Sequence, residues 1–355
     1  MTMKRLSRIP GLKIWALLLL LAGTFSACNV LEEEVEDCAL YVRFKYDMNM
    51  LNADAFSTNV KSVTVFVFKD GKFVFQKTEE GSLLEREGYR MRIDEIPYKQ
   101  KHAYDYVTWA GLKDNPNFTV PILQPGDTKD KLTCLLGRKH EARAGEPAWI
   151  QANLQALYHG MVNGADASRA ASSVADDEIL VSLTKNTNTV RVILQHYSAE
   201  PLNKDQFTFT VTDKNGLMNY DNNLLEDEQI TYYAWDTRQG YFDKEGNTLQ
   251  GGNLNMVVAD LSVARLMVSE EPELVVTNNE NGNEVLSFDL IEMARLIKGN
   301  YAAEPQFGYE MSDQEYLDRE DTYTMVFLLD NGLRWSNSML HINSWRVVLQ
   351  ESELQ

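Results

Sequence analysis

Cys28 carries the most specific chemistry in the sequence, because its thiol follows a basic start, a short apolar run and two small residues. The apolar run covers residues 14–22, and Ser26 and Ala27 stand directly before the cysteine. The basic side chains upstream of the run are Lys4, Arg5, Arg8 and Lys13. This order is typical of a secretory signal peptide, and the run is too short to span a bilayer. We therefore expect residues 1–27 to be removed by cleavage between Ala27 and Cys28.

The predicted cleavage site resembles a bacterial lipobox, in which the cysteine receives a diacylglycerol and an N-acyl chain and becomes the first residue of the mature protein. Phe25 stands where a lipobox usually has leucine. Each buried CH₂ group contributes about 0.8 kcal/mol, so acyl chains on Cys28 would hold the protein firmly on a membrane. The lipobox predicts a lipid-anchored, surface-exposed protein of the cell outer membrane. The alternative is ordinary secretion, with Cys28 merely near the cut.

Acidic side chains outnumber basic ones, giving the full chain a net charge of −18. Loss of residues 1–27, which hold four basic and no acidic side chains, makes the net charge −22. Such a surface argues against nucleic acid and against anionic lipid headgroups as partners, because both require basic patches. Five of the acids lie within residues 28–38, which we expect to form an extended tether. This run also resembles the export signal of Bacteroidetes surface lipoproteins, and a solvated spacer is the alternative.

Two further cysteines, Cys38 and Cys134, remain as thiols once Cys28 is acylated. An exported chain meets an oxidising compartment, so these two residues could form one disulfide. Two free, buried thiols are the alternative, because the sequence does not give the distance between them.

No enzyme signature occurs in the sequence, which lacks a Gly-rich phosphate loop, GxSxG, CxxC and HExxH. Residues 213–216 could offer oxygens to calcium but lack the remaining EF-hand ligands, so we expect a hairpin turn there. Asp318 and Glu320 lie near Arg319, where an ion pair or a cap is expected rather than a pair of catalytic carboxylates. The histidines are scattered singly and are expected to be structural: His102, His140, His159, His196 and His341. We therefore expect a non-enzyme with no metal and no cofactor other than the lipid on Cys28.

Short alternating strands separated by turn residues predict an all-β fold. Residues 40–46 alternate cleanly between apolar and polar side chains, and residues 60–68 form a more buried strand. Asp70-Gly71 then predicts a hairpin into residues 72–76. Further strands are expected at residues 89–93 and 102–110. Together these patterns predict an N-terminal β-sandwich over residues 39–165.

A small, polar stretch without apolar periodicity, residues 166–178, predicts a linker. A C-terminal β-sandwich is then expected over residues 179–355. Residues 288–297 place their apolar side chains on one helix face, and Ser312 begins a capping-box pattern for a short helix that reaches Glu320. The strands are expected at residues 179–183, 189–195, 206–211, 254–258, 265–268, 273–276, 323–329 and 340–349.

A series of short motifs in this order is similar to the FimB-like fimbrial anchor and accessory (or tip) subunits of Bacteroidales, which are fimbrillin-related lipoproteins of the minor-fimbria anchor type. The resemblance runs from about residue 38 to residue 349. We expect most of the matching residues to be scaffold, with Trp109, Tyr316 and Trp345 as core anchors. The motifs cover residues 41–47, 52–56, 63–68, 109–112, 157–160, 183–188, 220–222, 265–267, 314–320 and 342–346.

The resemblance implies two tandem transthyretin-like (Greek-key) β-sandwich domains, with one or two short helices in the second. It also implies a fimbrial (pilus) anchor or accessory subunit that attaches fimbriae to the outer membrane, terminates their assembly and supports adhesion. The implied partners are fimbrial shaft subunits, joined by β-strand donation. In that case residues 39–46 would stay in place as the first strand. Residues 347–355, or an open edge of the second sandwich, would contact the shaft.

A surface glycan-binding lipoprotein of a polysaccharide-uptake system is the main alternative function. Such a protein needs a flat, exposed aromatic platform for sugar rings. Trp149, or Trp235 with Tyr232 and Tyr233, could supply that platform. Burial of these side chains would favour the fimbrial interpretation. A structural outer-membrane lipoprotein without fimbriae is a third class, which fits everything except the motif matches.

Overall fold

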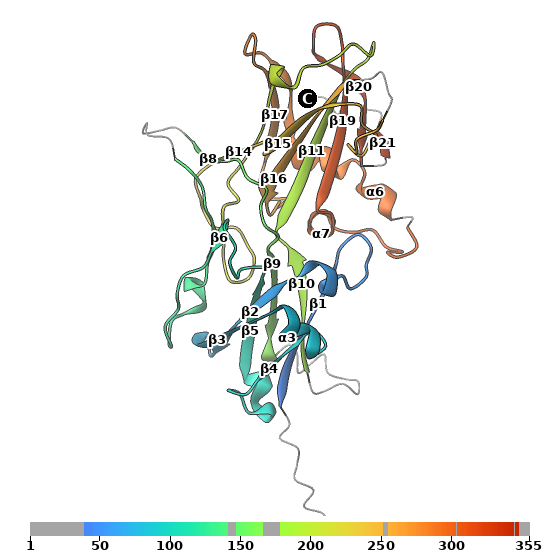
Figure 1. The fold of residues 1–355 in the computed structure, drawn as a ribbon. Helices are drawn as coiled ribbons and strands as arrows, with labels where there is room; N and C mark the ends of the chain where they lie inside the picture. Colours follow the sequence, from blue (N-terminus) through green and yellow to red (C-terminus); the bar gives the residue numbers. More distant parts are fainter. Residues whose placement is uncertain are drawn as a thin grey trace, which may run out of the picture.

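The computed structural model describes residues 39–140, 147–165, 178–250, 255–302, 304–343 and 345–347. The described chain is mainly β, as the sequence predicts, with four sheets and a few short helices. Within this part of the chain no helix is long and apolar enough to cross a membrane. Figure 1 shows an elongated molecule, with the earliest strands at one end and the latest strands at the other.

The first sheet has seven strands in the order β3-β2-β5-β9-β10-β1-β4. It curves so far that its two outermost strands approach each other, and Lys77 Nζ on β3 donates to Arg92 O on β4 at 2.7 Å. The Asp70-Gly71 hairpin between β2 and β3 is confirmed, with Lys69 paired to Lys72. The strands are β1 (Leu40–Met48), β2 (Ser62–Lys69), β3 (Lys72–Glu80), β4 (Arg90–Ile93), β5 (Tyr104–Ala110), β9 (Tyr158–Asn163) and β10 (Glu178–Lys185).

The predicted division of the chain at residues 166–178 differs from the pairing of the strands. β10, which the sequence analysis placed in the C-terminal sandwich, completes the first sheet between β9 and β1. Asn186 alone then separates β10 from β11 (Thr187–His196), which opens the second half. A small, polar pattern in the sequence therefore does not by itself mark a domain boundary.

Two sheets pack face to face in the second half (Figure 1). The six-stranded sheet has the order β15-β16-β11-β19-β20-β21, and the five-stranded sheet has the order β18-β17-β12-β14-β8. The strands of the six-stranded sheet are β11, β15 (Asp236–Gly240), β16 (Met256–Ala264), β19 (Thr322–Leu329), β20 (Trp335–Ile342) and β21 (Trp345–Val347). Those of the five-stranded sheet are β8 (Ala148–Ile150), β12 (Phe207–Asp213), β14 (Ile230–Tyr233), β17 (Glu273–Asn278) and β18 (Glu284–Asp289).

The segment between β5 and β9 ties the two halves together. Its short strand β7 (Cys134–Leu136) pairs with β6 (Phe118–Thr119) and with β13 (Leu217–Met218) of the second half. Its strand β8 extends the five-stranded sheet beside β14. The N-terminal half therefore contributes strands to sheets that also contain residues from the C-terminal half.

Helices are short and lie in the connections. Ser312 is confirmed as the N-cap of α7, because its side chain accepts from the Glu315 backbone N–H at 3.1 Å. The reciprocal half of the capping box is not formed, since the Glu315 carboxylate accepts from Tyr309 and Arg319 instead. The helices are α2 (Phe56–Asn59), α3 (Gly81–Arg86), α5 (Leu290–Arg295), α6 (Lys298–Tyr301) and α7 (Asp313–Arg319), and the 3₁₀ turns are η1 (Tyr98–Ala103), η2 (Lys129–Lys131) and η3 (Lys204–Gln206).

Three predicted elements are wrong. Residues 265–268 form no strand, because β16 ends at Ala264 and Arg265 turns toward α7. Residues 340–349 were expected to form one strand, but Asn343, at a φ of 51°, lies in a turn between β20 and β21. Residues 213–216 form no hairpin, because β12 pairs with β14 and β17 while β13 pairs with β7.

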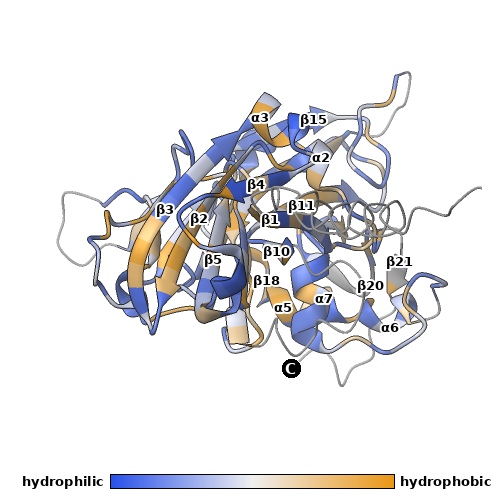
Figure 2. Ribbon diagram, turned by 90° about the horizontal axis from the view of Figure 1, so that it is seen from below, coloured by the Kyte–Doolittle hydropathy of each residue, from blue (hydrophilic) through white to orange (hydrophobic). Residues whose placement is uncertain are grey.

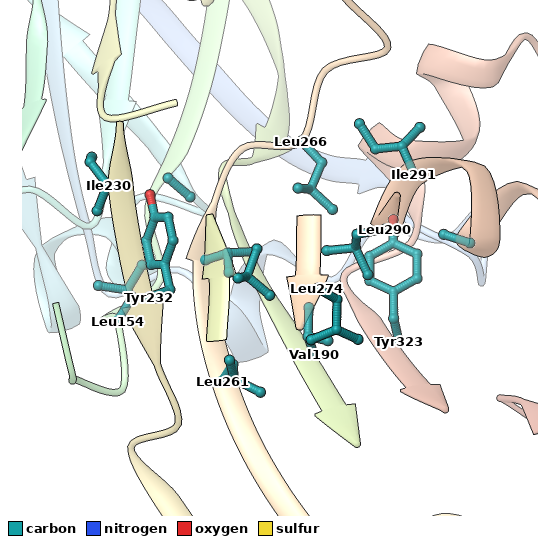
Figure 3. Packing of buried hydrophobic residues seen from close by; sticks show 14 of the residues in the cluster. Leu154, Val190, Ile230, Tyr232, Leu261, Leu266, Leu274, Leu290, Ile291 and Tyr323 are labelled. Carbon is teal, nitrogen blue, oxygen red and sulfur yellow. The ribbon is translucent and has the colours of Figure 1, made fainter. Parts of the chain in front are cut away.

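Buried apolar side chains fill both faces of β2. Val63, Val65 and Val67 pack with β1, β4 and the helices that cover them, and Phe66 and Phe68 face the segment between β5 and β9. Figure 2 shows hydrophobic residues along β2, which lies between β3 and β5. The second face belongs to a core that continues into the sandwich of the second half, where Val190, Leu261 and Leu274 meet (Figure 3). One continuous core therefore couples the two halves.

Candidate functional site: the junction and the outer sheet faces

The predicted lipid-attachment and cleavage residues, Ala27 and Cys28, lie outside the described residues, and so does Cys38. Cys134 lies in β7 with no exposed surface, and burial raises the pKa of its thiol above the ordinary value. A buried, protonated thiol is unreactive. The lipid on Cys28 and a Cys38–Cys134 disulfide stay predictions.

The first strand, β1, is hydrogen-bonded on both sides. It pairs antiparallel with β4, where Val42 faces Met91, and parallel with β10, where Phe44 faces Val181. Leu40, Val42, Phe44 and Tyr46 point into the core of the first half. β1 is therefore an interior strand of its sheet, and removing it would expose both a groove and an apolar core.

Many of the family-like motifs meet where β10 passes into β11, a region that we call the junction. At its centre the buried side-chain amides of Asn186 and Asn222 form a reciprocal pair, with N···O distances of 2.6 and 3.1 Å. The Asn186 backbone N–H donates to Leu157 O at 2.7 Å. Motifs from three distant parts of the sequence thus meet at one residue between the sheets.

His159 occupies the same junction. Its Nε2 donates to the Tyr220 carbonyl oxygen at 2.8 Å, and its ring packs edge-on against Trp109 at 4.6 Å. Burial lowers the pKa of His159 to about 4, so the ring is neutral at physiological pH. The next residue, Gly160, is required by the packing, since a Cβ there would lie 2.5 Å from Ser182 O on β10. His159 is structural, as the sequence analysis expected.

Arg265 links the junction to helix α7. Its guanidinium donates to both Asp318 carboxylate oxygens, at 2.8 and 3.0 Å, and to the Asn222 carbonyl oxygen. Gln314 donates to Asp318 at 3.0 Å and to Leu266 O at 3.2 Å. The sequence interpretation placed Asp318 with Arg319, and it missed Arg265 because the neighbouring residues read as a strand.

Arg319 joins α7 to the end of β1. Its Nε lies 2.9 Å from Glu315, and its Nη1 donates to Asp47 O at 3.2 Å and to Asn49 O at 3.3 Å. Lys185 at the end of β10 pairs with Asp321 at 2.6 Å. These contacts connect the two halves through charged side chains from α7 and the loop that follows it.

A cavity of about 230 Å³ lies beside these contacts, lined by residues of both halves that include Tyr46, Tyr158 and Glu320. Burial raises the pKa of Glu320 to about 7. Tyr301 Oη and Asn343 Nδ2 each donate to Glu320 Oε2 at 3.2 Å. The carboxyl is thus held by hydrogen bonds and has no arginine or lysine within ion-pair distance among the described residues.

The outer face of the six-stranded sheet carries a second cavity, of about 380 Å³. Ile193, Met256, Val326 and Leu328 line its apolar floor, and Asp243, Lys244 and His341 also line it. At one edge of this sheet, β21 ends at Val347. The remaining residues of the predicted shaft-contact segment, 348–355, lie outside the described part of the chain.

The aromatic residues of the glycan alternative differ in exposure and orientation. Tyr232 is fully buried, whereas Tyr233 and Trp235 are 37% and 38% exposed. Trp149 meets Tyr233 edge to face, at an interplanar angle of 87°. Burial of Tyr232 and the edge-to-face contact of Trp149 with Tyr233 favour the fimbrial interpretation, whereas Trp235 stays exposed.

The remaining histidines lie apart from one another. His140 contacts Glu228, His196 contacts Ser198, and His102 contacts the Gly164 carbonyl oxygen. Across the described ranges, no group of three histidine, cysteine or acidic side chains converges at metal-binding geometry.

Comparisons with known proteins agree with this architecture. Residues 34–351 match the family of fimbrillin-A associated anchor proteins Mfa1 and Mfa2. This is a family of fimbrial anchor proteins rather than of enzymes. A comparison with curated protein sequences finds no match.

Solved structures from Bacteroides thetaiotaomicron are similar over most of the chain. A candidate adhesin is 31% identical, with a TM-score of 0.69, covering 88% of this chain and 97% of its own. A candidate polysaccharide-binding protein is 28% identical, with a TM-score of 0.70, and the match covers 89% of this chain and 99% of that protein. The fimbrial anchor protein Mfa2 from Porphyromonas gingivalis shares the fold at 14% identity, with a TM-score of 0.57, covering 88% and 99%.

Proposed function

Because the chain belongs to the family of fimbrillin-A associated anchor proteins, we propose that it is an outer-membrane lipoprotein that attaches fimbriae to the cell and terminates their assembly. Its role is that of an anchor or accessory subunit that supports adhesion. Lipid on Cys28 holds the mature chain in the outer membrane, and the acidic residues that follow form a tether to β1.

The interior position of β1 is the observation that carries this proposal. A shaft subunit that is extended by strand donation must offer a groove for its neighbour's strand. Here β1 already fills the space between β4 and β10, and it is the first described element after the predicted lipid site. Proteolytic removal of β1 would also separate the folded chain from its lipid. A subunit that retains β1 offers no groove there and ends the polymer at the membrane.

The opposite end of the molecule is the better candidate for contact with the shaft. β1 begins at one end of the elongated fold, and β19, β20 and β21 lie in the other half (Figure 1). A strand can add to an outer strand of the second half through main-chain hydrogen bonds, with selectivity from alternate side chains. Residues 347–355, or such an outer strand, would make this contact.

A glycan-binding function is the second candidate, and one observation favours it: the 28% identity to the candidate polysaccharide-binding protein. The edge-to-face geometry of Trp149 and Tyr233 and the burial of Tyr232 favour the fimbrial role.

The test is deletion of the gene in its host, followed by imaging of fimbrial length and of the fraction of fimbriae shed into the medium. An anchor that ends assembly predicts longer or shed fimbriae. Complementation with Cys28→Ala should leave fimbriae shed, whereas Cys134→Ala, the matched control, should restore attachment. Unchanged fimbriae with lost binding to a glycan or a surface would move the protein to the glycan class or to the fimbrial tip.

Deletion of residues 347–355 tests the shaft contact separately. We expect this truncated protein to reach the membrane and to leave fimbriae unattached. Normal attachment and normal length would show that the shaft binds elsewhere, and the outer strands of the second half would be truncated next.

A further inference from the structure

An acidic cavity of about 310 Å³ lies at one end of the five-stranded sheet, where β12 ends and β17 begins. Its acidic lining residues are Asp213, Glu270, Glu271 and Glu273, and the only basic one is Lys214. Lys214 forms no ion pair with these acids in the described part of the chain. The cavity therefore holds more negative than positive charge, and its one basic residue is not paired with any of the four acids. This feature is independent of the fimbrial assignment, because it lies apart from β1 and from β21.

Asp213 makes this cavity different from an ordinary acidic surface. The residue is only 5% exposed, and its Oδ2 is buried without any hydrogen-bond partner. Its Oδ1 accepts only from the Lys214 backbone N–H, at 2.7 Å. A buried carboxylate without a partner is costly in free energy, so such a group either takes up a proton or acquires a cation.

The surroundings of Asp213 favour a cation over a side-chain partner. Burial, together with the smaller effects of the Glu270 and Asp289 charges, raises the pKa of Asp213 to about 7. Glu273 on β17 is partly engaged, because its Oε1 accepts from Ser287 at 2.6 Å. Glu270 lies in the loop after β16, where Ser269 contacts its carboxylate weakly, at 3.4 Å. The Glu270 carboxylate lines the same cavity as Asp213 and is near enough to act on it electrostatically, so a cation in the cavity would interact with both.

We propose that this cavity binds a calcium ion, with Asp213 and Glu270 as its carboxylate ligands. Calcium takes six to eight oxygen ligands in flexible geometry, and water and hydroxyl oxygens complete such a shell. No three acidic side chains converge on one point within the described residues, so the ion keeps part of its water. Sites of this kind in extracellular modules have dissociation constants on the order of 10⁻⁴–10⁻³ M. The ion ties the loop after β16 to the end of β12.

The experiment is calorimetric titration of the purified full chain with calcium chloride, with magnesium chloride and sodium chloride at matched ionic strength. We expect one calcium ion per chain and a rise in the thermal midpoint with calcium, as binding to the folded state alone requires. Asp213→Asn and Glu270→Gln should each weaken calcium binding by about tenfold or more. Glu284→Gln, an exposed acid on β18, is the matched control and should bind as the wild type does.

Several results would overturn the proposal. One is the absence of calcium binding at 10 mM, which is at least about ten times the expected dissociation constant. A second is binding of magnesium without binding of calcium. A third is calcium binding that survives both substitutions, because the ion would then bind elsewhere, such as at the acidic residues after Cys28. If Asp213→Asn fails to fold, Glu270→Gln decides the question, because Glu270 lies in a loop outside the strands.

Discussion

Two places in the molecule bury charged side chains beside the ends of strands: the junction around Arg265, between the two halves, and the acidic cavity around Asp213, in the second half. At the junction, Arg265 meets the Asp318 carboxylate through two hydrogen bonds. In the acidic cavity, Asp213 Oδ2 meets no partner at all. The charge of Asp318 at the junction is therefore paired with a guanidinium, whereas the Asp213 carboxylate in the cavity has no charged partner within ion-pair distance among the described residues.

The difference shows that burial of a polar side chain does not by itself indicate a ligand-binding site. The junction contains most of the family-like motifs, but its side chains mainly bind one another, so its role is to fix the two halves relative to each other. None of the residues that line the acidic cavity belongs to a family-like motif, and the nearest motif in the sequence is Arg265–Met267. It nevertheless has an unsatisfied carboxylate, and an unsatisfied group is what a ligand can complete.

Among the substitutions that test this comparison, Arg265→Met is expected to lower the free energy of unfolding most. Breaking a buried ion pair from one side leaves Asp318 uncompensated and costs about 3–5 kcal/mol. Chemical denaturation should report this loss as a lower free energy of unfolding. Arg92→Met is the matched control, because Arg92 pairs with Asp94 on an exposed surface, where an ion pair contributes about 0–1 kcal/mol. Equal losses of unfolding free energy in the two variants would show that the buried Arg265–Asp318 pair contributes no more than an exposed ion pair.

A smaller loss is expected from Asn222→Ala, because it leaves the buried Asn186 amide without its partner. Such a group costs about 1–3 kcal/mol. Asn222 also has a φ of 70°, a conformation that alanine adopts poorly. Asn222→Gly separates the two causes, since glycine tolerates this φ but still lacks the amide. If Asn222→Gly were as stable as the wild type in denaturant titration, the amide pair would carry no stability.

The smallest effect, when it is measured over one pH unit, is that of Glu320, whose pKa is raised by burial from 4.5 to about 7. The folded protein binds this proton more tightly than the unfolded chain does. Stability from the protonated carboxyl is therefore complete below about pH 4.5 and falls as the pH rises toward 7, by at most about 1.4 kcal/mol per pH unit. Glu320→Gln should reduce the slope of stability with pH in denaturation curves recorded at about pH 5, 6 and 7.5, and Asp213, whose pKa is also raised to about 7, should account for part of the remainder. A slope identical in Glu320→Gln and in the Glu284→Gln control would assign it to other groups.

The sequence predicted those parts of the fold that depend on local patterning. Alternation located β1, the Asp-Gly pair located the β2–β3 hairpin, and Ser312 located the start of α7. The motifs indicated the right family, which the match over residues 34–351 supports.

Long-range pairing could not be read from the sequence. β10 carries the same alternation whether it joins the first sheet or the second, and its place is decided by its contacts with β1 and β9. Arg265 follows a buried strand, so its local pattern indicates more strand, while its partner Asp318 lies 53 residues later. The unpaired Oδ2 of Asp213 is likewise a result of tertiary packing, since residues 213–216 taken alone indicate a turn.

The parallel pairing of β1 with β10 has a mechanical consequence. Tyr41 to Lys45 lie opposite Glu178 to Ser182, and beyond Lys185 the chain continues through Asn186 into β11 of the other half. Tension applied at the start of β1 and at the far half pulls these neighbouring strands in opposite directions along their length. The hydrogen bonds between them are then loaded in shear, all together rather than one after another. The same pairing recurs between β11 and β19, so a pull along the long axis of the molecule meets two such zones in series.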